Sequence, residues 1–198
     1  MRVAFFGCGF LTTWLAPALI KLFMSRERDL SIILIDAERV EPENLENSMF
    51  VHPYAGQYKT TNFSRLLRMV FPSLKITPVN MRVRRTNIGR IPNFDFAVCT
   101  FDNFESRKVV NDYCTEKNLD LLHVGVGDLS SVAVVWREGF YKAFRERAQE
   151  RVCERVDMIK MALLASSLAL KAVEEYLDKG RKISYIATNF RVVKISYI

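Results

Sequence analysis

The sequence predicts an α/β fold with a mainly parallel sheet, flanking helices and antiparallel β segments towards the C-terminal end. Three observations predict it. A short apolar run, Arg2 to Phe6, stops at a pair of glycines, and Leu11 to Met24 then carries apolar residues at helical spacing despite Pro17. A second apolar run, Ser31 to Ile35, ends in Asp36 within the length that a strand-helix-strand unit needs. Strands joined in this way pair in parallel, so the fold is predicted to be Rossmann-like.

The later elements continue the alternation. The segment Arg39 to Tyr58 is polar, contains proline and lacks periodicity, so we expect a long loop or a pair of short helical turns, of a length that is usually functional. The periodicities predict further helices at Lys59 to Val70, Glu105 to Cys114 and Asp157 to Leu177. They predict further β segments at Ile76 to Val83, Phe96 to Thr100, Leu121 to Val126, Val132 to Trp136, Lys182 to Tyr185 and Phe190 to Ile198.

Length and composition exclude several protein classes. The 198 residues are 49% hydrophobic, enough for one globular domain over residues 1–198, and disorder is excluded because apolar residues occur throughout. Only 8 Gly and 6 Pro are present, which excludes collagen-like and low-complexity proteins. The most hydrophobic stretch, Met161 to Leu170, is about half the length that spans a bilayer and is predicted to be a core helix rather than a membrane span.

The net charge is +7, which raises the question of nucleic-acid binding. Basic residues gather at 65–75, 82–90 and 137–155, but acidic residues are interleaved in the last of these, and no stripe of aromatic and basic residues accompanies them. We interpret the charge as solvated surface rather than a nucleic-acid site. A docking face for an acidic protein partner stays open.

The cysteines and the N-terminus concern the compartment. Cys8, Cys99, Cys114 and Cys153 are widely spaced and include no C-x-x-C pair, so neither a structural zinc site nor a disulfide framework is expected. The apolar run after Met1 is too short before its glycine to be a signal peptide. We therefore expect a reducing, cytoplasmic location.

A glycine motif follows the first predicted strand. Residues Gly7 to Thr12 read G-x-G-x-x-T, in which Gly7 and Gly9 allow a tight turn and a close approach of phosphate to backbone N–H groups. Thr12 replaces the third glycine, which mainly serves helix packing. Asp36, at the end of the second strand, is positioned to bind ribose hydroxyls. Together, the glycine motif and Asp36 favour nucleotide binding over an ordinary glycine turn. They do not identify the nucleotide.

The following segments identify a family resemblance. Asp36 to Leu45 resembles the D-x-D-x-V-x-x-x-N-L segment of the ThiF/MoeB/ubiquitin-activating family, with Glu38 in place of the second Asp. Gly56 to Lys59 resembles the G-x-x-K of that family, and Asp102 to Arg107 resembles its D-N-x-x-x-R helix start. The resemblance runs from about Arg2 to Trp136 and returns in the helix around residues 165–172.

The resemblance implies ATP-dependent adenylation of the C-terminal carboxylate of a small ubiquitin-like or sulfur-carrier protein, with ATP and Mg²⁺ bound. In that reading Lys59 supplies positive charge at the phosphates, Asp102 holds Mg²⁺, and Asn44 binds the triphosphate or ribose. The plainer alternatives are a solvated lysine at a helix start for Lys59 and a helix N-cap for Asp102. A homodimer or a related partner subunit is also implied.

The sequence departs from the family at its arginines. Asn47 and Ser48 stand where the family has an arginine and a glutamine, and a second arginine, contributed across the dimer from a helix ahead of the first strand, is expected to be missing. Arg82, Arg84 or Arg85 could compensate, but nothing in the sequence places them. A catalytically impaired, nucleotide-binding scaffold subunit is therefore the alternative function.

Other candidate groups are weaker. Cys153 lies near where some family members carry a thiol that receives the activated carboxyl, and its neighbours Arg151 and Arg155 would favour a thiolate, yet an incidental cysteine on a charged helix fits as well. His52 and His123 are too isolated to suggest a metal site or a triad, and His123 is expected in the core. An NAD-dependent oxidoreductase is the third candidate, opposed by the lack of a catalytic His or Tyr-x-x-x-Lys.

Overall fold

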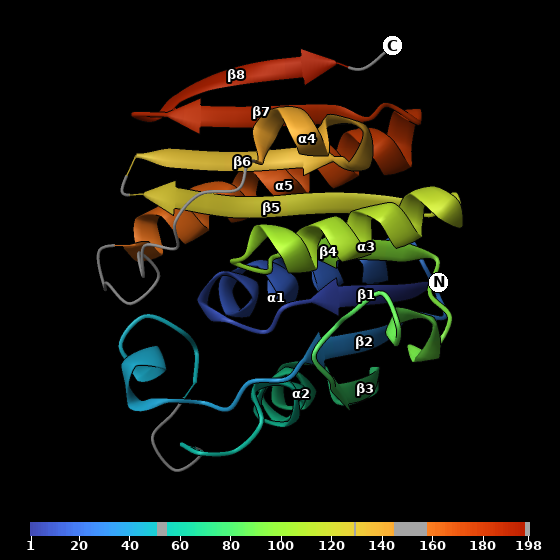
Figure 1. Ribbon diagram of the computed structural model, residues 1–198, viewed down its shortest axis with the longest axis vertical. Coiled ribbons are helices and arrows are strands. Elements are labelled where there is room, and N and C mark those ends of the chain that lie inside the picture. Colours follow the sequence, from blue (N-terminus) through green and yellow to red (C-terminus); the bar gives the residue numbers. More distant parts are fainter. Residues whose placement is uncertain (51–54, 129, 145–157, 197–198) are drawn as a thin grey trace.

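A computed structural model describes residues 1–50, 55–128, 130–144 and 158–196 (Figure 1). Its strands form one sheet in the order β3-β2-β1-β4-β5-β6-β7-β8. The strands are β1 (Arg2–Phe6), β2 (Ser31–Asp36), β3 (Lys75–Asn80), β4 (Phe96–Cys99), β5 (Asp120–Asp128), β6 (Ser131–Trp136), β7 (Ile183–Thr188) and β8 (Arg191–Ser196). The helices are α1 (Phe10–Met24), α2 (Lys59–Val70), α3 (Phe104–Glu116), α4 (Phe140–Ala143) and α5 (Ile159–Lys179), with 3-10 turns η1 (Pro42–Leu45), η3 (Ile88–Arg90) and η4 (Arg137–Gly139).

The sheet is parallel from β3 to β5 and antiparallel from β5 to β8, which confirms the predicted Rossmann-like fold class. The central strands are buried on both faces, as parallel strands usually are. In β1, for example, Val3 and Phe5 belong to one apolar cluster, and Ala4 and Phe6 belong to the other.

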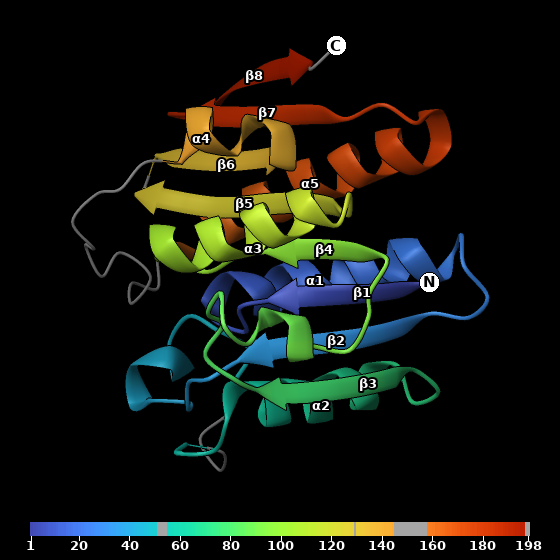
Figure 2. The ribbon, with the colours of Figure 1, turned by 45° about the vertical axis from the view of Figure 1, so that its right-hand side comes forward.

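Helices cover both faces of the sheet. Residues of α1, α2 and α5 pack in the larger apolar cluster, and residues of α3 and of the segment before β4 pack in the smaller one. Figure 2 shows α3 and α4 in front of the sheet and α1 and α5 behind it. None of the helices in the described residues is long and apolar enough to cross a membrane.

The main differences from the predicted elements are short and local. The strand predicted to reach Val83 ends at Asn80, because its neighbour β2 ends at Asp36, opposite Asn80, and Val83 packs in the smaller apolar cluster. The helix α4 and the 3-10 turns η3 and η4 were not predicted, because elements of three or four residues have no measurable periodicity. The turn η1 lies in the segment Arg39 to Tyr58, where short helical turns were one expectation.

The order of the strands fixes where a ligand would bind. The chain runs outward from β1 to β3 on one side and from β4 to β5 on the other, so the direction of winding reverses between β1 and β4. In open α/β sheets, ligands bind at the carboxyl ends of the strands beside such a reversal. The residues that follow β1, β2 and β4 are therefore the first place to look.

Candidate functional site

Three segments meet at this edge of the sheet. Gly7 follows β1, Asp36 ends β2, and Asp102 lies three residues beyond the end of β4. These strands are neighbours and parallel, with Phe6 opposite both Ile35 and Cys99, so their carboxyl ends lie side by side. The tertiary structure thus brings the glycine motif and two of the predicted carboxylates to one edge.

The glycine turn needs glycine at its first position. Gly7 has φ +100°, and a Cβ there would lie 2.6 Å from Thr100 Oγ1 and 3.1 Å from the Phe101 nitrogen. Gly9 is the N-cap of α1 at φ −81°, without a side-chain cap, and a Cβ there would meet no described atom within 4 Å. The position beside the α1 N-terminus is therefore open in the described part of the chain, and the helix dipole favours an anion at this end of the helix.

Thr12 joins the turn to its neighbours. Its hydroxyl donates to the Gly7 carbonyl over 2.8 Å and lies 2.5 Å from the hydroxyl of Thr100, and its side chain is fully buried. This explains why a threonine can replace the third glycine of the motif: the residue fastens α1 to the strand-end loops.

Asp36 anchors the same turn from the β2 side. Its Oδ2 accepts the Cys8 N–H at 2.7 Å, and its Oδ1 accepts the Glu38 N–H at 2.8 Å. Burial raises the pKa of Asp36, and the two backbone hydrogen bonds act against that rise. Sequence reasoning assigned Asp36 only to ribose and missed its bond to Cys8. Ribose binding stays a prediction, which the second lone pair on each carboxylate oxygen allows.

Lys59 opens α2 and is buried, so the alternative of a solvated lysine is wrong. Its ammonium lies 2.6 Å from Glu38 Oε2, and its backbone N–H donates to the Glu38 carbonyl over 2.9 Å. Burial by itself would lower the pKa of Lys59, but the hydrogen bond and charge of Glu38, with the charges of Asp36 and Glu41, raise it. The residue therefore carries its charge close to Asp36.

Asp102 is exposed in the loop between β4 and α3. The alternative of a helix cap is wrong: the N-cap is Asn103, whose Oδ1 accepts the Ser106 N–H at 2.8 Å. The Asn103 amide also donates to Asp102 Oδ1 over 3.2 Å. The carboxylate of Asp102 is thus exposed near the carboxyl end of β4. A carboxylate in such a place suits a metal ion whose other ligands are phosphate oxygens.

Arg107 supports the loop between β4 and α3 through hydrogen bonds to the neighbouring strands, a role that the sequence did not reveal. Its guanidinium is buried, donates to the carbonyls of Cys99 and Val124 over 3.1 and 2.9 Å, and lies over the Phe144 ring at 4.3 Å. It therefore ties the first turn of α3 to the end of β4 and to the middle of β5. Its place in the D-N-x-x-x-R motif was the signal that could have found it.

Asn44 and Asn47 lie in the segment after β2. Asn44 Oδ1 accepts the Glu41 N–H at 3.1 Å in a capping box over η1, so its side chain has a local role, and nucleotide contact stays a prediction. Asn47 is buried, and its carbonyl accepts the Trp14 indole N–H at 2.7 Å. The position where the resemblance leads us to expect an arginine is thus enclosed.

The three candidate compensating arginines separate in the structure. Arg85 donates to Asp112 Oδ2 on α3 over 2.9 Å, which commits it to the α3 face. Arg82 and Arg84 are exposed. Arg82 directly follows Met81, which is bonded to the Asp36 carbonyl, so of the three Arg82 lies nearest along the chain to the site.

The cysteines that the structure describes are poor nucleophiles. Cys8, Cys99 and Cys114 are buried, and burial raises the pKa of each thiol, for Cys114 to about 12. Cys153 and His52 lie outside the described residues. Within the described ranges, no three His, Cys, Asp or Glu side chains gather as a metal site.

His123 is a core residue, as expected. Its Nε2 lies 3.1 Å from Asn111 Oδ1, and its ring stacks on Phe140 at 4.5 Å. Burial, with the nearby charge of Arg107, holds the pKa of His123 well below its usual value. It is therefore neutral and has no task at the strand edge.

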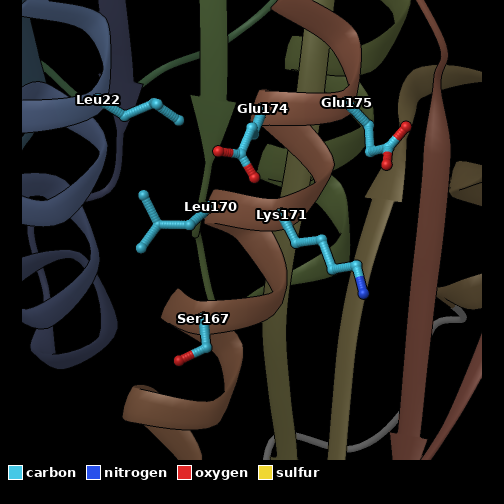
Figure 3. Close-up of a pocket in the computed structure, with 6 residues that line it drawn as sticks. All are labelled: Leu22, Ser167, Leu170, Lys171, Glu174 and Glu175. Atoms are coloured by element: carbon cyan, nitrogen blue, oxygen red, sulfur yellow. The ribbon is translucent and has the colours of Figure 1, made fainter. Parts of the chain in front are cut away.

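A separate groove lies between α1 and α5 (Figure 3). It is lined by Leu22, Ser167, Leu170, Lys171, Glu174 and Glu175. Leu22 is near the C-terminal end of α1, whereas the glycine turn is at its N-terminal end. The groove thus lies between two helices, towards the end of α1 away from the glycine turn, and is distinct from the candidate nucleotide site.

Comparison with known proteins agrees with the motifs. The ThiF family model matches residues 1–196. Ubiquitin-like modifier-activating enzyme 5 of Drosophila ananassae is 29% identical, and that of Drosophila grimshawi is 26% identical; each match covers 80% of this chain and 47% of the relative. The chain thus spans about half the length of the curated relatives that it matches.

Solved structures share the fold. Escherichia coli MccB, in a structure with MccA-N7isoASN, has a TM-score of 0.76 at 16% identity, and the match covers 98% of this chain and 63% of that one. PaaA has a TM-score of 0.68 at 17% identity, with the same coverage.

Proposed function

Because the chain belongs to the ThiF family, we propose that it binds ATP with Mg²⁺ and adenylates the C-terminal carboxylate of a small ubiquitin-like or sulfur-carrier protein. The observation that carries this proposal is the meeting of the Gly7 turn, Asp36 and Asp102 at adjacent strand ends, with Lys59 charged beside Asp36. We take residues 1–198 as a single adenylation domain.

The relatives support this choice of reaction. Those with the similarity given above are named as ubiquitin-like modifier-activating enzymes. Escherichia coli MccB, which shares the fold, has been solved with ATP and, in a further structure, with MccA. The names of the relatives favour a protein substrate, and the MccB structures favour ATP and a second substrate of the MccA kind.

The proposed step joins two anions. A carboxylate oxygen of the carrier attacks the α-phosphorus of ATP, the bond from that phosphorus to the bridging oxygen breaks, and pyrophosphate leaves with the electron pair. Lys59 would offset the charge that repels the carboxylate. The open α1 N-terminus at Gly9 would receive phosphate oxygens. Mg²⁺, when bound through Asp102, would neutralise charge on the phosphates, and one exposed carboxylate with phosphate oxygens is a usual ligand set for it.

A second candidate is a nucleotide-binding scaffold subunit that lacks catalysis. The observation that favours it is Asn47, which is buried at the position where the resemblance leads us to expect an arginine. Retention of Lys59 and Asp102 opposes the scaffold, because both groups would offset charge in the adenylation step. An NAD-dependent oxidoreductase would use the glycine turn and Asp36 equally, but it would leave the Asp102 segment without a role.

The protein partner would dock on the antiparallel end of the sheet. Phe190, Val192 and Val193 expose 58, 47 and 59% of their surface there, and Arg191 and Lys194 lie among them. An apolar surface with basic residues favours an acidic protein, and the net charge of +7 would help to attract it. A second copy of this chain or a related subunit would complete the assembly.

Calorimetry with Mg-ATP and with NAD tests the nucleotide. Tight binding of ATP and none of NAD is expected, and the reverse would overturn the assignment. Exchange of labelled pyrophosphate into ATP, dependent on a small protein ending in Gly-Gly that is encoded beside this chain, tests the enzyme. If ATP binds but that exchange is absent, the proposed function becomes that of a nucleotide-binding scaffold subunit instead of an enzyme.

A further inference from the structure

The two partners of the ion pair between Lys59 and Glu38 differ in their exposure to solvent. The two charged atoms lie 2.6 Å apart, but the Lys59 side chain is only 9% exposed, whereas that of Glu38 is 62% exposed. Lys59 is thus held in place by its burial at the start of α2. Glu38 is the partner that can leave, because its carboxylate is already largely in water and exposed ion pairs contribute little free energy.

The Glu38 side chain is not needed to hold the turn together. The backbone of Glu38 already does so: its N–H donates to Asp36 Oδ1 at 2.8 Å, and its carbonyl accepts the Lys59 N–H at 2.9 Å. These two bonds join the end of β2 to the start of α2. The Glu38 carboxylate therefore has one described partner, the Lys59 ammonium.

The local charge is unfavourable to a nucleotide. The Glu38 carboxylate lies 2.6 Å from the Lys59 ammonium, and the charges of Asp36 and Glu41 also act on that ammonium. A triphosphate brought to Lys59 would meet a cation that is already neutralised. Departure of Glu38 would restore the charge of Lys59 and remove the nearest negative group at the same time.

We propose that Glu38 competes with the phosphates of ATP for Lys59, and that this competition sets the affinity of the site. The inference rests on the proposed function, since it takes Lys59 as a phosphate ligand. Before nucleotide binds, Glu38 occupies the ammonium; when ATP binds, phosphate oxygens replace the carboxylate, which turns to solvent. Glu38 thus weakens ATP binding, although it lies in the site.

The test is calorimetric titration of Mg-ATP into the wild-type chain and Glu38→Gln. The variant keeps the backbone bonds and removes the competing charge, so ATP should bind about three to ten times more tightly, in line with the strength of a partly exposed ion pair. The matched control is Glu41→Gln, which removes an equal charge that acts on Lys59 without a direct hydrogen bond to its ammonium. Its effect should be smaller.

A double variant separates competition from simple charge removal. In Lys59→Met, the change Glu38→Gln should no longer tighten ATP binding, because there is no ammonium to release. Titration of adenosine, which has no phosphate, should be unaffected by Glu38→Gln. A shift for adenosine equal to that for ATP would mean that Glu38 shapes the pocket instead.

The outcomes keep the two proposals apart. If the wild-type chain and Glu38→Gln both bind no ATP, the proposed function fails. If the wild type binds ATP and Glu38→Gln binds it equally or more weakly, with unchanged melting temperature, the competition is overturned while the nucleotide site stands. Equal tightening in Glu41→Gln would also overturn it.

Discussion

The backbone N–H of Cys8 donates to the carboxylate of Asp36 over 2.7 Å, which joins the glycine turn after β1 to the end of β2. The bond is buried, and Asp36 also accepts from Glu38. The carboxylate proposed for ribose therefore fixes the shape of the loop proposed for phosphate. Nucleotide affinity and stability should depend on the same side chain.

Substitution of Asp36 tests that dependence. Asp36→Ala removes two charge-assisted hydrogen bonds, each worth about 1.5–3 kcal/mol, and leaves the buried Cys8 N–H and the partly buried Glu38 N–H without their acceptor. We expect the melting temperature to fall and the Kd for ATP to rise at least tenfold. The control is Asp29→Asn, at an exposed carboxylate before β2, which should change neither. Weakened ATP binding at unchanged stability would show that Asp36 contacts the nucleotide without supporting the turn.

The two glycines of the turn should respond differently to alanine. Gly7→Ala forces a positive φ on a residue with a Cβ and places that Cβ 2.6 Å from Thr100 Oγ1, so a loss of about 1–3 kcal/mol of stability is expected. Gly9→Ala should leave the stability within about 0.5 kcal/mol, since the position is open and its φ is ordinary.

Gly9→Ala should nevertheless weaken the binding of ATP, because the added methyl group would occupy the space proposed for phosphate at the start of α1. Thermal unfolding and calorimetry measure the two effects. Equal destabilisation by both variants would contradict the geometry of the turn. Unchanged ATP affinity in Gly9→Ala would show that the phosphates do not bind at the N-terminus of α1.

Lys59 and Asp102 should be required for catalysis. Lys59→Met and Asp102→Asn are each expected to lower carrier-dependent pyrophosphate exchange by about a hundredfold or more, since each removes a group that offsets transition-state charge. Circular dichroism should show a folded protein in both cases, because Asp102 is exposed and the partner of Lys59 is largely in water.

Cys153→Ser is the matched control for the exchange measurement, because adenylation needs no thiol. It should leave the exchange rate unchanged and affect only a later transfer to sulfur. Loss of exchange in Cys153→Ser would instead place that residue in the adenylation step.

His123 predicts a sensitivity of stability to mild acid. Burial and the charge of Arg107 hold its pKa well below 6.5 in the folded chain, so only the unfolded chain takes up this proton near pH 6.5. The stabilisation is complete above about pH 6.5 and is lost as the pH falls towards the folded pKa, by at most about 1.4 kcal/mol per pH unit.

Denaturant unfolding between pH 7.5 and about 5 measures this slope. The His123→Gln variant should be less stable than the wild type at pH 7.5, but its free energy of unfolding should change less with pH across this range. Asp112 and Asp120, whose pKa values are lowered by their ion pairs, contribute their own loss only below about pH 4. An unchanged slope in His123→Gln would assign the acid sensitivity to other groups.

Local patterns in the sequence were enough to predict most of the elements and the place of the candidate site. Alternation of apolar runs with helical periodicity is local information, and it sufficed for the parallel sheet and for most element boundaries. The motifs at Gly7, Asp36 and Asp102 could be read for the same reason: each lies directly after a strand, and parallel strands bring their carboxyl ends to one edge.

Which side chains face one another depends on how the elements pack, and local sequence patterns do not show it. Glu38 and Lys59 are 21 residues apart, and whether they pair depends on how α2 packs against the end of β2. Arg85 could have faced the site, but it pairs with Asp112 because the segment after β3 crosses to the α3 face. Such choices follow from three-dimensional packing and burial, which set distances and charge environments that no spacing along the chain encodes.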